Sequence, residues 1–273
     1  MTLDNLIAKA LQEDLGTGDL TTAYLDLPKK DTVAHLVAKQ DGVICGLEVA
    51  YKTFMQVDPS VRWIAYKKDG DLVKKGENIA KIEGYSSSIL QAERVALNFL
   101  QRMSGIATLT WQHVQLIKPY KAKLLDTRKT TPLLRILEKY AVRTGGGYNH
   151  RFGLYDMIMI KENHIRAAGS ITEAVNRIKK HNTSYKIEVE VTNLTELKEA
   201  VDNKVDRVML DNMNLDQIKE AVDIFGGLIE MEVSGNVKLH TIEAIAATGV
   251  DFISSGSLTH SYNSLDISLL FKE

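Results

Sequence analysis

The chain has 273 residues, of which 44% are hydrophobic and 25% are charged, and its formal net charge is −1. These values are ordinary for a folded globular protein, and the length suits one large α/β domain or two smaller ones. A net charge this close to zero argues against general nucleic-acid binding, and no apolar run approaches the roughly 20 residues that span a bilayer. The single cysteine, Cys45, excludes an internal disulfide and leads us to expect a cytoplasmic protein.

The first hundred residues predict an α+β domain with an antiparallel sheet. Apolar residues recur at helical spacing from Leu3 to Leu11, and residues 13–22 are rich in turn formers and predict a loop. Strands are predicted at 32–39, 42–47, 61–66 and 78–83, and helices at 48–57 and about 88–118. We place this domain at residues 1–107 and expect the C-terminal tail, residues 264–273, to join it.

The second part, residues 108–263, alternates strands with helices. Strands are predicted at 122–126, 156–160, 186–191, 206–211, 228–233 and 250–254, and helices at about 132–142, 170–181, 194–202, 214–224 and 239–248. Such alternation indicates a parallel sheet. No Gly-x-Gly-x-x-Gly follows the first of these strands, which weakens a dinucleotide-binding open sheet. We therefore expect an incomplete β/α barrel with fewer than eight strands.

Charge is unevenly distributed in this second part. Residues 121–166 contain ten Lys/Arg against four Asp/Glu, whereas residues 182–251 contain fourteen Asp/Glu against six Lys/Arg. Apolar runs and glycines interrupt the basic stretch, so it is not a disordered basic tail. A folded enzyme concentrates cations in this way when it holds a strongly anionic small molecule.

Polar residues stand where the predicted barrel strands end. Because the residues just past the strands of a β/α barrel face one common mouth, we expect these side chains to lie together. In chain order they are Asp126, Arg128, Lys129, His150, Arg151, Lys161, Asn163, His164, Glu188, Glu190, Asp211, Asn212, Ser234, Gly235, Asn236, Ser254, Ser255, Gly256 and Ser257.

The order of these residues predicts what the mouth binds. Arginines and lysines at the first strands suit carboxylates or a pyrophosphate, and carboxylates at the middle strands suit ribose hydroxyls or Mg²⁺. Gly/Ser loops at the last strands suit a phosphate. Glu188 and Glu190 share one face of their strand, so one of them can be purely structural. The pattern indicates a site for a sugar phosphate and a second, multiply charged acid.

Several of these features also have a plainer interpretation. Arg135, Lys139 and Arg143 fall at helical spacing and are expected to be surface charges. The glycines at 145–147 form either a functional loop or only a flexible connector. The segment 255–257 either binds phosphate or only caps the helix after it.

The chain strongly resembles the quinolinate phosphoribosyltransferases, and the similarity extends over nearly the whole length. The segments that carry it are Glu13–Thr22, Glu93–Arg94, Leu100–Thr108, residues 126–164, Glu188–Val191, Met209–Asn212, Glu232–Asn236 and Gly256–His260. One departure is Ser86-Ser87, where the family commonly has Ala-Arg, so we assign no substrate contact to that loop.

This resemblance implies a type II phosphoribosyltransferase with an N-terminal α/β sandwich domain and an incomplete β/α barrel. It also implies a homodimer, a requirement for Mg²⁺, and the formation of nicotinate mononucleotide, pyrophosphate and CO₂ from quinolinate and phosphoribosyl pyrophosphate. By position, Arg128, His150, Arg151 and Lys161 would hold quinolinate, together with Arg94 from the second subunit. Lys129 would lie between the two substrates. Glu190 and Asp211 match the ribose and Mg²⁺ residues, and Ser234, Gly235 and Gly256 match the phosphate cradle, beside which Asn236 and Ser255 are expected.

Two alternatives remain open at the level of sequence. One is a molybdate-transport-associated paralogue on the same scaffold, and the other is a non-catalytic barrel that binds a sugar phosphate. The complete cationic set, from Arg94 to Lys161, favours the quinolinate enzyme. The paired positions Glu190 and Asp211 argue against a protein that only binds.

Overall fold

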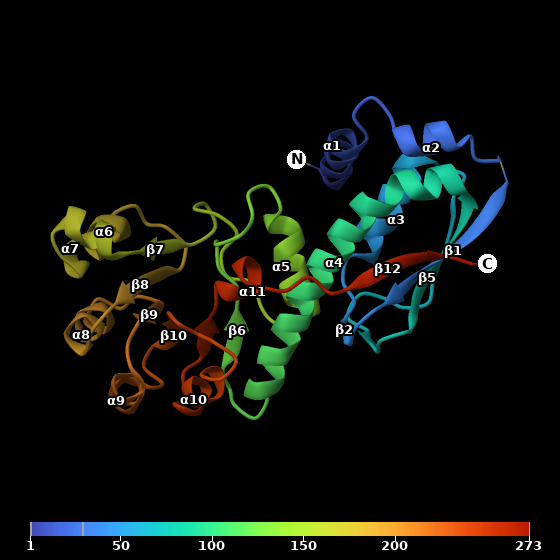
Figure 1. Ribbon diagram of the computed structural model, residues 1–273. Helices are drawn as coiled ribbons and strands as arrows, with labels where there is room; N and C mark the ends of the chain where they lie inside the picture. Colours follow the sequence, from blue (N-terminus) through green and yellow to red (C-terminus); the bar gives the residue numbers. More distant parts are fainter. Residues whose placement is uncertain (1, 29, 273) are drawn as a thin grey trace. The chain divides into compact units, whose positions relative to one another are not determined.

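The computed structural model describes residues 2–28 and 30–272. Residues 1, 29 and 273, which fall within the segments expected to form the first domain, lie outside the described residues. Two compact units are present, one made of Met1–Leu109 with Tyr262–Glu273 and the other of Thr110–Ser261. Their elements are labelled in Figure 1.

The first unit is built on a four-stranded antiparallel sheet with the order β12-β1-β5-β3. Its strands are β1 (Asp31–Ala38), β3 (Arg62–Ala65), β5 (Asn78–Tyr85) and β12 (Ile267–Phe271), and β2 (Gly42–Val43) and β4 (Leu72–Val73) form a separate pair. Strand β12 comes from the C-terminal tail and pairs with β1 over its whole length. The predicted antiparallel sheet is therefore confirmed, although the strand predicted at 42–47 is only two residues long.

Helices accompany this sheet. They are α1 (Leu3–Leu15), α2 (Leu20–Leu25), α3 (Leu47–Val57) and the first part of α4 (Ser86–Ile117). Two of them, α3 and the first part of α4, share one apolar core with the sheet, whereas α1 contacts α3. Leu36 and Ile82 of the sheet, Phe54 of α3 and Leu100 of α4 have no exposed surface and belong to one apolar cluster. The alternation of apolar residues along the strands thus produces one buried face, as expected for a half-covered sheet.

Part of the loop predicted at 13–22 is helical. Helix α2 begins at Leu20 because the Asp19 side chain accepts a hydrogen bond from the Thr22 N–H at 3.1 Å. Asp19 is thus an N-cap, which is the role that Asp fills well at a helix start. The loop prediction is correct only for the residues between Leu15 and Asp19.

The second unit contains a six-stranded parallel sheet with the order β6-β11-β10-β9-β8-β7. The strands are β6 (Lys123–Leu125), β7 (Ile158–Ile160), β8 (Ile187–Val191), β9 (Arg207–Asp211), β10 (Glu230–Ser234) and β11 (Phe252–Ser254). Each lies within a predicted strand segment or extends one residue beyond it. The expectation of an incomplete β/α barrel with fewer than eight strands is confirmed.

Helices follow the strands, and the longer ones lie along the outer side of the sheet (Figure 1). They are α5 (Arg135–Thr144), α6 (Glu162–Ala168), α7 (Ile171–Lys179), α8 (Leu194–Asp202), α9 (Leu215–Phe225), α10 (Ile242–Ala247) and α11 (Ser257–His260). Ser170, Asn193 and Asn214 cap α7, α8 and α9 through their side-chain oxygens, which explains why these helices start where they do. Helices α6 and α11 are short and begin within three residues of a strand end; α6 was not predicted, whereas a helix after residues 255–257 was considered.

The segment 148–152 connects the two edge strands of this sheet. Tyr148 forms a parallel bridge with Leu125 of β6, and the Asp126 N–H donates to the Tyr148 carbonyl oxygen at 3.1 Å. Three residues later, Arg151 Nη1 donates to the Met157 carbonyl oxygen at 3.1 Å, immediately before β7. The segment therefore holds residues of the mouth between β6 and β7, where the six strands leave the barrel incomplete.

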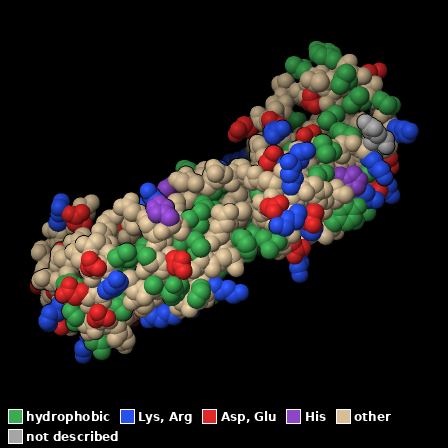
Figure 2. All heavy atoms as spheres, turned by 60° about the horizontal axis from the view of Figure 1, so that its bottom comes forward, with side chains coloured by type: hydrophobic (Ala, Val, Ile, Leu, Met, Phe, Trp, Pro, Cys, Tyr) green, Lys and Arg blue, Asp and Glu red, His purple; other side chains and the backbone are tan. Residues whose placement is uncertain are grey.

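On the face drawn in Figure 2, basic and acidic side chains are interspersed with apolar ones over the surface. Such mixing agrees with the formal net charge of −1. None of the helices within residues 2–28 and 30–272 has the length and apolar character needed to cross a membrane.

Candidate active site

A cavity of about 610 Å³ opens at the C-terminal ends of the barrel strands. Each strand contributes to its lining: Thr127, Arg128 and Lys129 follow β6, Met159 and Lys161 belong to or follow β7, Glu190 lies in β8, Met209, Asp211 and Asn212 in or after β9, Glu232, Ser234, Gly235 and Asn236 in or after β10, and Ser254 in β11. His150 and Arg151 of the connecting segment complete the wall. The strand-end residues therefore meet at one mouth.

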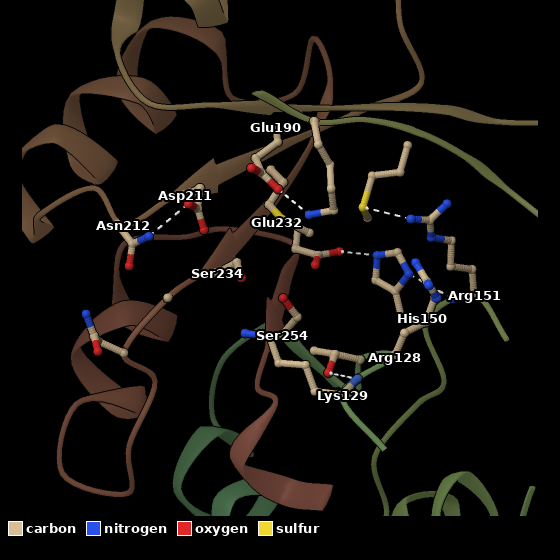
Figure 3. A pocket seen from close by; sticks show the side chains of 16 residues that line it. Arg128, Lys129, His150, Arg151, Glu190, Asp211, Asn212, Glu232, Ser234 and Ser254 are labelled. Carbon is tan, nitrogen blue, oxygen red and sulfur yellow. Dashed lines mark hydrogen bonds and ion pairs between the residues drawn. The ribbon is translucent and has the colours of Figure 1, made fainter. Parts of the chain in front are cut away.

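The cavity separates charges by side (Figure 3). Arg128, His150 and Arg151 lie on one side, and Glu190 and Asp211 lie on the other. A second cavity of about 430 Å³ shares Lys129, Ser234, Gly235 and Asn236 with the first and adds Ser255 and Gly256. The predicted cationic, acidic and Gly/Ser groups are thus arranged around connected space in the second unit.

The two arginines on the cationic side differ in their internal partners. Arg151 is 9% exposed and donates to the Met157 carbonyl oxygen and, at 3.5 Å, to Met159 Sδ. Burial and the nearby Arg128 lower the pKa of Arg151 below its usual value. The buried Arg128 Nε has no hydrogen-bond partner among the described residues. A ligand with carboxylate oxygens would satisfy that donor and would relieve the repulsion between the two cations.

The acidic side contains two carboxylates near a lysine. Lys161 Nζ forms an ion pair with Glu190 Oε2, and Asn212 Nδ2 donates to Asp211 Oδ2 at 2.8 Å. Burial and the neighbouring Glu190 carboxylate raise the pKa of the Asp211 carboxyl above its usual value. Two carboxylates that repel each other in this way offer a site for a cation or for hydroxyl donors.

The loop after β10 needs glycine at position 235. Gly235 has a φ of +98°, and a Cβ there would lie 2.2 Å from Asn212 Oδ1. Asn212 and Asn236 also have positive φ, of 54° and 51°. Only a residue without a side chain allows the two loops to approach this closely, and the open backbone is then available to a ligand.

Comparisons with known proteins place the chain in one family. The family model for the quinolinate phosphoribosyl transferase C-terminal domain matches residues 106–270, and the model for the N-terminal domain matches residues 19–104. The chain belongs to the quinolinate phosphoribosyltransferase family. This result confirms the resemblance inferred from the motifs between Glu13 and His260.

Individual relatives of this family match over nearly the full chain. Quinolinate phosphoribosyltransferase [decarboxylating] 1 of Nicotiana glauca is 44% identical over 287 residues, which cover 98% of this chain and 81% of that protein. Two solved structures of nicotinate-nucleotide pyrophosphorylases are also similar. The one from Francisella tularensis has a TM-score of 0.94 at 44% identity and covers 99% of this chain and 96% of its own. The one from Ehrlichia chaffeensis has a TM-score of 0.96 at 40% identity and covers 100% of this chain and 99% of its own.

Most of the residues that the family resemblance selects line the two cavities. Those in the larger cavity are Arg128, Lys129, His150, Arg151, Lys161, Glu190, Asp211, Ser234, Gly235 and Asn236, and Ser255 and Gly256 line the smaller one. Arg94 lies on α4 in the first unit, where its side chain is exposed, and it is not among the lining residues. Asn163 and His164 belong to α6, and the His164 Nδ1 accepts the Lys161 N–H at 3.0 Å instead of lining the cavity.

Sequence reasoning gave no role to Glu232, which supports the cavity from inside the barrel together with Glu188. Glu188 and Glu232 are fully buried, and their Oε2 atoms lie 3.1 Å and 3.3 Å from His150 Nε2. Of the pair weighed on β8, Glu190 lines the cavity and Glu188 does not. The sequence did contain a signal for Glu232. It stands two residues before Ser234, so both side chains lie on the same face of β10.

Lys139 is a second missed support, and the expectation that it is a surface charge was wrong. Its side chain has no exposed surface, and its Nζ forms an ion pair with the equally buried Asp126. Arg135 is half-buried and donates to the Phe152 carbonyl oxygen at 2.7 Å, whereas Arg143 is exposed as expected. The glycines at 145–147 are more than a flexible connector, because a Cβ at Gly147 would lie 2.8 Å from Val142 Cγ1.

Proposed function

We propose that this chain transfers the phosphoribosyl group of phosphoribosyl pyrophosphate to quinolinate with loss of CO₂, as a step of de novo NAD biosynthesis. The products are nicotinate mononucleotide, pyrophosphate and CO₂. The observation that carries the proposal is the division of one cavity into a side with Arg128 and Arg151 and a side with Glu190 and Asp211, in a member of this family. The names of the relatives, which include decarboxylating quinolinate phosphoribosyltransferases, support the same reaction.

Quinolinate occupies the cationic side in this proposal. Its two adjacent carboxylates need several fixed cations, which Arg128, Arg151 and Lys161 supply, with His150 beside them. The free Nε of Arg128 supports this assignment, because a buried donor without a partner is costly until a ligand binds it. Lys161 exchanges Glu190 for a substrate carboxylate when quinolinate binds.

Phosphoribosyl pyrophosphate occupies the other side. The loops of Ser234, Gly235 and Gly256 offer backbone N–H groups to the 5-phosphate, with Asn236 and Ser255 beside them. Glu190 and Asp211 accept hydrogen bonds from the ribose hydroxyls. Lys129 lines both cavities, so it is suited to contact the pyrophosphate between the two substrates.

Glu190 and Asp211 are also the residues that would hold Mg²⁺, directly or through water. The fit rests on the donor set, because the carboxylates of Glu190 and Asp211 line the same cavity, and Glu190 helps to raise the pKa of Asp211, an effect that a divalent cation would oppose. When bound, Mg²⁺ adds positive charge beside the pyrophosphate that leaves.

The chemistry needs no protein nucleophile. The pyridine nitrogen of quinolinate attacks the ribosyl C1 as the bond to pyrophosphate breaks, and Lys129 stabilises the negative charge of the leaving group. The bond from C2 to its carboxylate then breaks, the electron pair stays on C2 beside the positively charged nitrogen, and C2 takes up a proton. The main contributions of the cavity residues are positioning and electrostatic stabilisation.

We further propose a cytoplasmic homodimer in which the partner's Arg94 completes the quinolinate end of each cavity. Arg94 has an exposed side chain and does not line the cavity of its own chain, which is consistent with a contribution to a second subunit. Cys45 is the one cysteine of the sequence and is buried, which is consistent with a reducing compartment.

The direct test is to incubate the purified chain with quinolinate, phosphoribosyl pyrophosphate and Mg²⁺ and to measure CO₂ and pyrophosphate. We expect both products in equal amounts, together with nicotinate mononucleotide. Binding of a sugar phosphate without turnover would instead identify a binding protein on this scaffold. Turnover of phosphoribosyl pyrophosphate with another acceptor, but not with quinolinate, would contradict the proposed substrate.

A further inference from the structure

Arg207 lies at the N-terminal end of β9, and Asp211, which lines the cavity, lies at the other end of the same strand. Its guanidinium carbon is 3.9 Å from the centre of the Phe252 ring, and its side chain is only 13% exposed. Nη2 lies 3.1 Å from Glu230 Oε2, and Nη1 lies 3.3 Å from Glu232 Oε2. Arg207 is therefore a nearly buried cation that contacts two carboxylates of β10 and no cavity space.

Glu232 depends on this cation. The carboxylate has no exposed surface, and burial by itself would raise its pKa. The neighbouring His150 and, to a smaller extent, the charge of Arg207 outweigh burial and lower the pKa of Glu232 below its usual value. Without Arg207, the buried Glu232 carboxylate would lose one of the cations beside it, which is unfavourable in a site of low dielectric constant.

Glu232 in turn fixes the His150 ring. Nε2 faces the oxygens of Glu232 and Glu188, and Nδ1 accepts the Arg151 N–H at 2.8 Å. Because Nδ1 accepts a hydrogen bond, Nε2 carries a ring proton, and it lies 3.1 Å from Glu188 Oε2 and 3.3 Å from Glu232 Oε2. The orientation of the ring thus determines the position of the Arg151 backbone, and the Arg151 side chain lines the cavity.

His150, Glu188 and Glu232 satisfy the distance requirement for a metal site, since their ligand atoms lie within 4.8 Å of one another. The hydrogen bond to Nδ1 argues against a metal ion there. A histidine that binds a metal through Nε2 donates its other N–H to an acceptor, whereas here Nδ1 receives an N–H. Arg207 also already supplies the positive charge that Glu232 needs. The cluster is therefore a buried support whose groups interact through their charges.

We propose that Arg207 is a positioning residue for the quinolinate end of the cavity. It acts through Glu232 and His150 on Arg151 and touches no substrate. The inference rests on the proposed function, because it names the substrate whose binding depends on Arg151. It adds a residue that lies outside the cavity lining.

The first experiment compares Arg207→Met with a matched control in the full-length chain. We expect Arg207→Met to raise the KM for quinolinate roughly tenfold and to leave the KM for phosphoribosyl pyrophosphate within about twofold. The control is Lys186→Met, because Lys186 Nζ lies 3.6 Å from the same Glu230 oxygen but the side chain is 61% exposed. The control should behave like the wild type. A variant with a general defect of the barrel would instead raise both KM values, since β9 and β10 also carry Asp211 and Ser234.

A double variant tests the order of the contacts. In Arg207→Met/Glu232→Gln the neutral amide needs no cation, and its oxygen can still accept a hydrogen bond from His150 Nε2. We expect this double variant to recover most of the quinolinate affinity that Arg207→Met loses, even if the single variant folds poorly. Equal losses in both variants, or an unchanged quinolinate KM in Arg207→Met, would overturn the proposal.

A spectroscopic readout separates this proposal from the proposed reaction. In ¹⁵N-histidine NMR spectra of the full chain, with the His150 signals assigned from a His150→Gln sample, we expect an Nε2–H ring in the wild type and a changed His150 signal in Arg207→Met. Unchanged His150 signals would contradict the positioning role whether or not the chain turns over quinolinate. An inactive wild type with the expected signals would reject the reaction and leave the ring-positioning part intact.

Discussion

Lys139 and Asp126 form an ion pair in which neither side chain has any exposed surface. The pair also holds both polar backbone groups of His150. Lys139 Nζ donates to the His150 carbonyl oxygen at 2.9 Å, and Asp126 Oδ1 accepts the His150 N–H at 2.9 Å. Because one residue of the cavity wall is fixed on both sides, this buried pair connects the stability of the barrel to the geometry of the site.

Replacing Lys139 by Met should destabilise the chain by about 3 to 5 kcal/mol, because Asp126 would remain buried without its cation. Urea unfolding followed by circular dichroism measures the change. Arg143→Met is the matched control, since Arg143 lies one turn further along α5 and is exposed, and it should cost less than about 0.5 kcal/mol. Similar losses in the two variants would contradict the role given to the buried pair.

Much of the fold could be predicted because its elements carry local signals. The barrel strands are short apolar segments between polar residues. Each predicted segment covers the whole of the observed strand or all of it except one residue. Helix α2 could not be predicted in this way, because Gly16 and Gly18 indicate a loop and the two capping contacts of Asp19 with Thr22 are decisive. Strand β12 pairs with β1, more than two hundred residues away in sequence, and no local pattern specifies that pairing.

The cavity residues could be predicted from one rule, that residues past barrel strands face a common mouth. The buried residues that support the cavity could not be predicted from this rule. Lys139 and Arg143 have the same helical spacing pattern in sequence, yet only Lys139 meets Asp126. Arg207 begins its strand at the end opposite the cavity, so the strand-end rule does not select it. Such roles depend on which charged groups the tertiary fold brings together.

Replacing Arg128 or Arg151 by Ala should have the same effect on kinetics but different effects on the free energy of unfolding. Both variants should lose at least about a hundredfold in kcat/KM for quinolinate, because a substrate carboxylate would lack its partner. Only Arg151→Ala should also lower the unfolding free energy, by about 1 kcal/mol or more, since it removes the hydrogen bonds to Met157 and Met159. Steady-state kinetics and urea unfolding of both variants measure the difference. Wild-type kinetics in both variants would reject the quinolinate assignment.

Gly235→Ala should weaken the binding of phosphoribosyl pyrophosphate. The new Cβ would lie 2.2 Å from Asn212 Oδ1 and 3.1 Å from the Asn212 backbone nitrogen, so the two loops must separate. Gly227→Ala is the control for strain alone, since Gly227 also has a positive φ, of 80°, but its Cβ would meet no atom within 4 Å. Both variants should lose about 1 kcal/mol of stability, but only Gly235→Ala should raise the KM for phosphoribosyl pyrophosphate, by roughly tenfold or more. An equal change of this KM in both variants would show that backbone strain alone accounts for the weaker binding.

Asp156 should make the segment that carries Arg151 sensitive to acid. Burial by itself would raise the pKa of Asp156, but its carboxylate accepts the Gly153 N–H at 3.0 Å and the Phe152 N–H at 2.6 Å, and these bonds lower the pKa below its usual value. A lowered folded-state pKa stabilises the fold above the unfolded value of about 3.9 and loses that effect as the pH falls through the folded value. The difference in melting temperature between wild type and Asp156→Asn should therefore shrink from pH 7 to pH 3. A difference that does not depend on pH would contradict this origin.

Mixing two inactive variants tests whether Arg94 acts in the partner's site. Arg94→Ala and Lys161→Ala should each be nearly inactive as homodimers. In a mixed dimer, the subunit with an intact Lys161 would receive an intact Arg94 from its partner, so one of the two sites regains both cations. After random exchange of subunits, about a quarter of all sites should be active, because about half of the dimers are mixed. Sedimentation confirms the dimer, and the CO₂ assay measures the recovery. No recovery after proven exchange would mean that Arg94 serves the cavity of its own chain or none.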